Sequence, residues 1–130
     1  MTMKIEHIAL WVKNLELMKE FYCTYFGFEA GDKYQNQAKG FTSYFLRKPD
    51  GPRLELMHRN DIPVYFGERG EKMGLAHFAI SLGSTQEVDH ITANFEQNGI
   101  AVLGQPRWTG DGYYESVIED PEGNWIELTV

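Results

Sequence analysis

Polar and apolar residues alternate along several short stretches of the chain, as they do in β-strands that bury one face. Residues 4–12 are the first such stretch and predict a strand. After Asn14, apolar side chains recur at helical spacing, and Gly27 follows the last of them. Asn is a favourable helix N-cap and Gly a common helix stop, so we predict a helix between the two. Three more strands are expected, at 29–34, 41–47 and 53–57.

The same order of elements recurs from Leu75 onward. Residues 75–82 again alternate, and Ser84 with Glu87 forms the S-x-x-E capping box that marks a helix start. An apolar helical stripe continues to Asn98, and strands are expected at 101–103, 113–119 and 125–130. In both halves a turn that contains Pro and Gly precedes the last strand, at 49–52 and at 120–124.

The repetition predicts an α+β fold of two β-α-β-β-β modules, about 4–59 and 75–130. Residues 60–74 are the expected connector, and together these parts make one domain, 1–130, a usual size for a domain. In each module the aliphatic side chains of the strands gather on one face, which the module's helix can cover.

Two histidines and two glutamates occupy matching places in the two halves. His7 and His77 are 70 positions apart, and Glu55 and Glu127 are 72 apart. Because strand side chains alternate, all four lie opposite the aliphatic face. Two imidazoles and two carboxylates that converge predict a divalent metal site, which suits Zn, Ni, Co or Mn and leaves two octahedral positions for water or substrate.

Composition excludes several other classes of function. The 130 residues include 12 Lys and Arg against 19 Asp and Glu, a net charge of −7, which disfavours nucleic acid and anionic membrane surfaces. Cys23 is the only cysteine, so no internal disulfide can form. The longest clean apolar run, 8–12, is far shorter than a membrane span. We expect a soluble, cytoplasmic protein with a small-molecule substrate.

The chain resembles the vicinal oxygen chelate superfamily, which includes glyoxalase I, bleomycin-resistance proteins and extradiol dioxygenases. The stretches that carry the resemblance span almost the whole chain: IEHIALWVKNLELMKEFYCTYFGFE, RLELM, GLAHFAISL and DPEGNWIEL. The resemblance implies that the modules form a cupped, mixed eight-stranded sheet, with the helices on its outer face and one divalent ion inside. It also implies a homodimer and the ligands His7, Glu55, His77 and Glu127.

The order His-Glu-His-Glu is similar to that of bacterial glyoxalase I, a lyase that isomerises the thiol adduct of a 2-oxoaldehyde through an enediolate. The resemblance then implies Glu127 as the catalytic base and Glu55 as its counterpart. Two alternative hypotheses remain besides a glyoxalase I-like lyase. One is a protein that binds an antibiotic or another small molecule without turnover, and the other is a thiol transferase or oxygenase on the same scaffold.

Four further residues are substrate candidates. Arg53 shares the face of Glu55 and could meet an anionic group, while Trp11 shares the face of His7. Trp108 and Tyr114 belong to an aromatic, glycine-containing stretch that suits a lid. Glu115 is expected to be a solvated acid.

Overall fold

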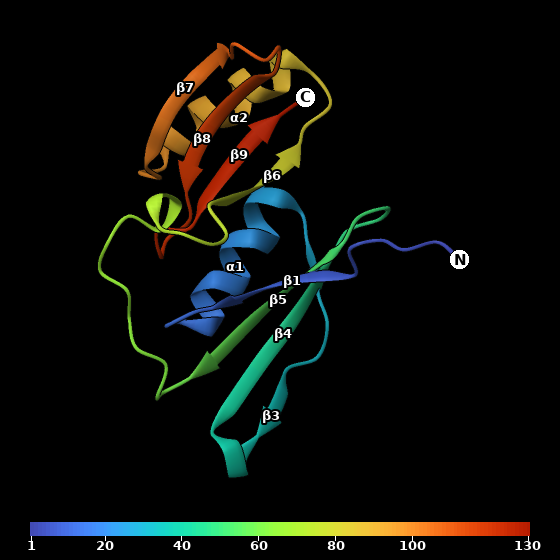
Figure 1. The fold of residues 1–130 in the computed structure, drawn as a ribbon, viewed down its shortest axis with the longest axis vertical. Coiled ribbons are helices and arrows are strands. Elements are labelled where there is room, and N and C mark those ends of the chain that lie inside the picture. Colours follow the sequence, from blue (N-terminus) through green and yellow to red (C-terminus); the bar gives the residue numbers. More distant parts are fainter. The chain divides into compact units, whose positions relative to one another are not determined.

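A computed structural model describes all residues, 1–130, and divides the chain into two compact units, Met1–Val64 and Tyr65–Val130. The boundary falls within the expected connector. Each unit consists of one sheet with one long helix, and each sheet is mixed, with one parallel pair of strands (Figure 1). The predicted α+β fold of two repeated modules is therefore confirmed.

The first unit forms a five-stranded sheet in the order β1-β5-β4-β2, with β3 also paired to β4. β1 runs parallel to β5, and the other pairs are antiparallel. A short 3-10 helix, Gln37–Lys39, precedes β4. The elements are β1 (His7–Trp11), α1 (Leu15–Phe26), β2 (Glu29–Ala30), β3 (Tyr34–Asn36), β4 (Phe41–Arg47) and β5 (Arg53–Arg59).

The single strand expected at 29–34 is two short strands, so the two sheets hold nine strands instead of eight. Ala30 pairs with Leu46, and Tyr34 pairs with Ser43. Residues 31–33 therefore face only two residues of β4. These three residues belong to no strand, so they separate β2 from β3 along the shared partner strand.

Helix α1 begins and ends where its capping residues predict. The side chain of Asn14 accepts a hydrogen bond from the Leu17 amide at 3.0 Å, and Gly27 closes the helix with a φ of +69°. Met18 and Tyr22 are fully buried, as the stripe predicts. Phe21 and Phe26 are buried as well. This helix face covers one side of the sheet, where it packs on β4 and β5.

The second unit forms a four-stranded sheet in the order β6-β9-β8-β7, in which β6 and β9 are parallel. A 3-10 helix, Arg69–Glu71, lies in its first segment. Helix α2 packs on β7, β8 and β9 and lies against one face of the sheet (Figure 1). The elements are β6 (His77–Ser81), α2 (Thr85–Gln97), β7 (Val102–Trp108), β8 (Tyr114–Glu119) and β9 (Trp125–Thr129).

Strand β7 is longer than the expected 101–103, because it continues through Gly104 and Pro106 as far as Trp108. Register shifts occur at both of these positions, between Val102 and Gly104 and between Gly104 and Arg107. Gly and Pro within a strand commonly mark such irregular pairing at a sheet edge. Because both residues are unfavourable in regular strands, the predicted strand ended too early. No helix of either unit is long and apolar enough to cross a membrane.

Candidate metal-binding residues

The histidine and the glutamate of each unit stand in the same register. In the β1–β5 pair, His7 lies opposite Arg53 and Ala9 opposite Glu55. In the β6–β9 pair, His77 lies opposite Trp125 and Ala79 opposite Glu127. Each glutamate is therefore two residues beyond its histidine on the neighbouring parallel strand, and the two side chains share one face of the sheet.

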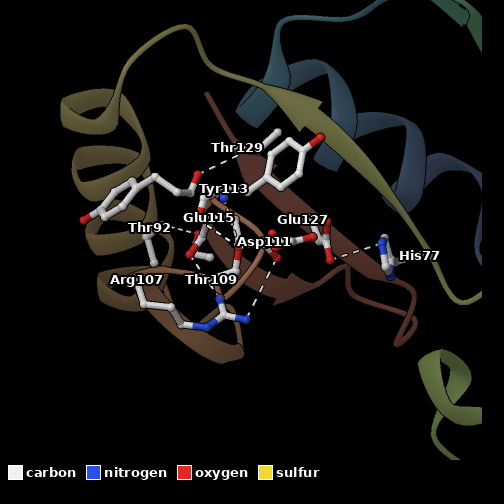
Figure 2. Close-up of polar contacts among 11 residues, drawn as sticks. His77, Thr92, Arg107, Thr109, Asp111, Tyr113, Glu115, Glu127 and Thr129 are labelled. Atoms are coloured by element: carbon white, nitrogen blue, oxygen red, sulfur yellow. Dashed lines mark hydrogen bonds and ion pairs between the residues drawn. The ribbon is translucent and has the colours of Figure 1, made fainter.

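The paired side chains approach each other closely in both units. His7 Nε2 is 3.7 Å from Glu55 Oε1, and His77 Nε2 is 3.1 Å from Glu127 Oε2. Figure 2 shows the second pair, with the imidazole of His77 directed at the carboxylate. The histidine side chains are 39% and 40% exposed, whereas Glu55 and Glu127 are only 14% and 23% exposed.

The opposite face of each sheet is apolar and lies against the helix. Leu54 and Leu56 flank Glu55 along β5 and are buried, and Ile126 and Leu128 flank Glu127 along β9 in the same way. The alternation inferred from the sequence thus holds in all four strands. The polar face that carries the histidines and glutamates is the one the helix leaves uncovered.

The donor set of each pair fits a divalent ion. Zinc binds imidazole nitrogen and carboxylate oxygen at about 2.0–2.2 Å, so two neighbouring ligands are about 3.0–3.5 Å apart, from an octahedral to a tetrahedral arrangement. The 3.1 Å separation in the second unit matches this spacing, and the 3.7 Å separation in the first is slightly longer. Nowhere in the chain do three or more His, Cys, Asp or Glu side chains gather to hold an ion. Each unit by itself supplies two donors.

A carboxylate that the sequence analysis missed contacts the first histidine. Glu6 Oε1 lies 2.8 Å from His7 Nδ1. Arg53 donates to both oxygens of Glu6, from Nη2 at 2.7 Å and from Nε at 3.0 Å. The hydrogen bonds from Arg53 and then from His7 hold the pKa of Glu6 at about 2. The only available sequence signal was the position of Glu6 beside His7, because the contact with Arg53 comes from strand pairing.

Another acid, Glu115, lies beside the second pair, and the prediction that it is solvated was wrong. Glu115 is only 8% exposed, because it pairs with Thr129 across the central β8–β9 ladder and shares the face of Glu127. Burial and the neighbouring Glu127 raise the pKa of Glu115, while Arg107 lowers it. Arg107 Nη2 is 3.9 Å from Glu115 Oε2, and Arg107 Nη1 donates to the Glu115 carbonyl (Figure 2). Alternation along 114–119 could have indicated the face on which Glu115 lies, but not its burial, which depends on strand pairing.

The substrate candidates lie in different surroundings. Trp11 is on the His7 face, with the Arg59 guanidinium 5.2 Å from its ring. The Arg53 guanidinium is engaged with Glu6, as described above. The rings of Trp108 and Tyr114 are 5.2 Å apart.

Tyr114 donates from its hydroxyl to Asp89 Oδ1 of α2 at 2.5 Å. It alternates with Glu115 along β8, and it lies on the same side as Ser116, which bonds to Thr92 of the helix. The helix face of the sheet therefore holds Tyr114, and the structure does not bring it to the face of His77 and Glu127.

Two repeated modules, each with a histidine–glutamate pair on the uncovered face of a mixed sheet, define the class of α+β protein to which this chain is compared. The model of the glyoxalase/bleomycin resistance protein/dioxygenase superfamily matches residues 4–128. The chain belongs to this superfamily, as its sequence resemblance indicated.

Two curated relatives and one solved structure show the range of this similarity. A catechol-2,3-dioxygenase of Bacillus subtilis is 31% identical over 125 residues, which are 95% of this chain but 40% of that protein. A trivalent organoarsenical cleaving enzyme of a Bacillus species is 32% identical over 97% of this chain and 72% of the enzyme. The trypanothione-dependent glyoxalase I of Leishmania major shares the fold, with a TM-score of 0.78 at 21% identity over 98% of this chain and 86% of that one.

Proposed function

We propose that the protein is a metal-dependent lyase of the glyoxalase I type. His7, Glu55, His77 and Glu127 are the proposed ligands of one divalent ion, which is Zn, Ni, Co or Mn. The observation that carries this proposal is the shared register. Glu55 has the same position relative to His7, on the neighbouring parallel strand, as Glu127 has relative to His77. A ligand set of two histidines and one carboxylate would not account for the second glutamate, which has an equivalent position in its own unit.

The proposed substrate is the thiol adduct of a 2-oxoaldehyde. A bound ion would supply positive charge next to the substrate oxygens, which acidifies the neighbouring C–H bond. A carboxylate of Glu127 takes that proton and returns it to the adjacent carbon, with Glu55 as its counterpart. The isomerisation moves the C–H proton to the adjacent carbon and the hydroxyl proton to the neighbouring oxygen, all within the substrate, so it needs neither an oxidant nor a reductant.

The surroundings of Glu127 support its role as the base. Its side chain is 23% exposed, so it is open to a substrate yet partly screened from water. It lies beside the buried Glu115, whose pKa is raised in part by the charge of Glu127. A general base must first of all be able to reach the proton that it takes, and the partial exposure of Glu127 allows such contact.

The test begins with metal analysis of the purified protein, followed by an assay of hemithioacetal isomerisation with each of the four metals. Glu127→Gln should abolish turnover and leave the fold intact, and Glu55→Gln should reduce it strongly. Glu71→Gln changes an exposed glutamate of the 69–71 turn and serves as the control. Absence of turnover with every metal, or failure to bind any divalent ion, would overturn the proposal.

A catechol dioxygenase is the second candidate, favoured by the relative named catechol-2,3-dioxygenase. The chain spans 40% of the length of this relative, so the comparison covers less than half of it. Oxygen consumption with catechol and Fe(II) would identify this activity. The same preparation should be offered a trivalent organoarsenical, because the second relative is named for cleaving one. Product release there, without hemithioacetal turnover, would replace the lyase proposal.

The remaining parts of the proposal concern assembly and location. We propose that two copies of the chain form a homodimer in the cytoplasm and that the partner of the site is a small molecule. The single cysteine and the acidic charge are compatible with this location. Sedimentation of the purified protein measures the mass of the assembly directly, and a mass of one chain would contradict the dimer.

A further inference from the structure

The imidazole of His7 has a neighbour on each ring nitrogen. Nδ1 lies 2.8 Å from Glu6 Oε1, and Nε2 faces Glu55 Oε1 at 3.7 Å. An ionised carboxylate can only accept a hydrogen bond, so the hydrogen bond to Glu6 requires a proton on Nδ1. In a neutral ring the lone pair then belongs to Nε2, the nitrogen directed at Glu55.

Glu6 is itself held in place by a fork of hydrogen bonds. The Arg53 guanidinium bonds to both carboxylate oxygens, and the Arg53 amide also donates to the Glu6 carbonyl at 2.9 Å. A bidentate Arg–carboxylate pair fixes orientation more firmly than a single contact does. Glu6 can therefore present one oxygen to His7 in a constant position.

Phe45 contacts both the imidazole and the guanidinium. The Arg53 guanidinium stacks over the Phe45 ring at 4.0 Å from its centroid. The same ring meets the His7 imidazole edge to face, with centroids 5.4 Å apart and an angle of 85° between the planes. His7, Glu6, Arg53 and Phe45 thus form a closed set of contacts, which we call the His7 clamp.

The second unit lacks this arrangement. Ala76 precedes His77, in the place of Glu6, and Trp125 lies opposite His77, in the place of Arg53. Neither side chain can accept a hydrogen bond from the imidazole, and Ala76 offers no carboxylate in the place of Glu6. The two histidines share one backbone register and differ in what orients their rings.

We propose that Glu6, held by Arg53, is a positioning residue that keeps His7 protonated at Nδ1 with Nε2 free to bind the ion. The inference rests on the proposed function, since it needs a divalent ion at His7. A hydrogen bond from the distal ring nitrogen to a carboxylate orients a ligand histidine and raises its basicity, and loss of such a partner typically weakens metal affinity 10–100-fold.

The first measurement is Zn²⁺ affinity, by competition titration with a chelating dye. Glu6→Ala should weaken Zn²⁺ binding about 10–100-fold. Glu6→Gln keeps an acceptor oxygen but loses the charge. Arg53→Lys keeps a charge but loses the paired hydrogen bonds to Glu6. Both variants should therefore weaken Zn²⁺ binding less than Glu6→Ala does. Glu20→Gln, on an exposed position of α1, is the matched control and should bind Zn²⁺ like the wild type.

The second measurement is the tautomer of His7 in the metal-free protein, from long-range proton–nitrogen NMR spectra of ¹⁵N-labelled histidine. Wild type should show His7 protonated at Nδ1, and Glu6→Ala should lose this preference while the signals of His77 stay in place. His77 is the internal check that the variant is folded. A purely structural role for Glu6 would not change the tautomer of one ring alone.

The outcomes separate this inference from the proposed function. Equal Zn²⁺ affinity of wild type and Glu6→Ala, or an unchanged His7 tautomer, overturns the inference and leaves the lyase proposal standing. A wild-type chain that binds no Zn²⁺ overturns both. Weakened binding in Glu6→Ala together with no hemithioacetal turnover in the wild type supports the clamp and counts against the lyase proposal alone.

Discussion

Arg53 and Trp125 occupy equivalent places in the two modules, because each lies opposite the histidine of its own parallel strand pair. Their side chains differ in what they contact. Arg53 bonds to Glu6, which in turn bonds to His7. Trp125 packs beneath Gly70 of the turn that contains the 3-10 helix Arg69–Glu71. The repeat therefore reproduces the backbone of the half-site, while one module supports its histidine with a charge network and the other covers the neighbouring position with an indole ring.

The packing of Gly70 on Trp125 gives a first prediction. A Cβ at position 70 would lie 2.0 Å from Trp125 Cδ2, so Gly70→Ala must displace either the turn or the indole. Overpacking of this kind costs about 1–3 kcal/mol, and urea denaturation should show that loss. Gly110→Ala is the matched control, because nothing lies within 4 Å of the added methyl group there.

A second variant separates packing from backbone effects at the same turn. In a Trp125→Leu background the ring is gone, so the additional cost of Gly70→Ala should shrink clearly. If Gly70→Ala were as stable as Gly110→Ala, the close approach of the turn to Trp125 would be refuted.

Metal binding should increase the free energy of unfolding, and this effect can be measured without any substrate. A ligand that binds only the folded chain adds about 2.7 kcal/mol when its concentration is 100 times its dissociation constant. Zn²⁺ should therefore raise the urea midpoint of the wild type, and a chelator should reverse the rise. His7→Ala and His77→Ala should each lose most of this gain. His90→Ala, an exposed histidine of α2, should keep it; equal gains in all three variants would exclude both proposed histidines.

The features predicted correctly from the sequence are those that depend on neighbours along the chain. Asn14 and Ser84 cap their helices through bonds to amides three residues ahead, and alternation along single strands placed His7 and Glu127 on the polar face. The burial of Glu115 was not foreseen, because it depends on pairing with Thr129 across the β8–β9 ladder. Strand pairing is a long-range choice that local pattern does not specify.

The contacts around His7 were missed for the same reason. Arg53 is 47 positions from Glu6 along the chain, and only the parallel register of β1 and β5 brings them together. The break between β2 and β3 at 31–33 likewise depends on how these two strands share β4 as a partner. The local sequence was sufficient to predict the residue types of the site. Their contact partners depend on strand pairing and could not be predicted from it.

A buried pair of hydroxyls in the second unit gives another prediction. Thr92 of α2 and Ser116 of β8 are fully buried, with their oxygens 2.7 Å apart, and the Thr92 hydroxyl also lies 2.6 Å from the Val88 carbonyl. Ser116→Ala and Thr92→Val should each lower the free energy of unfolding by about 1 kcal/mol, because each removes a buried hydrogen bond. The double variant should lose less than the two single losses added together, since no hydroxyl is then left without its partner. Strict additivity in urea denaturation would show that the two groups are not coupled.

Glu16 in the first turn of α1 predicts part of the acid sensitivity of the protein. Lys33 Nζ lies 3.1 Å from Glu16 Oε1, and the Tyr44 hydroxyl donates to the same carboxylate at 2.9 Å. The hydrogen bond from Lys33, and then that from Tyr44, lowers the pKa of Glu16 below its ordinary value of 4.5. Below about pH 4.5 the unfolded chain therefore binds more protons at this position than the folded chain does, and stability falls as the pH falls.

Glu16→Gln should remove this pH dependence at one position. At neutral pH the variant should be less stable than the wild type by a fraction of 1 kcal/mol, because the Glu16 side chain is half exposed and solvent weakens the pair. The difference should shrink as the pH falls through the window below 4.5 and vanish once the wild-type carboxylate is protonated. Urea midpoints between pH 2 and pH 7 measure it, with Glu20→Gln on the same helix as control. A difference between wild type and Glu16→Gln that stays constant over this range would show that the contacts of Glu16 with Lys33 and Tyr44 do not stabilise its charge.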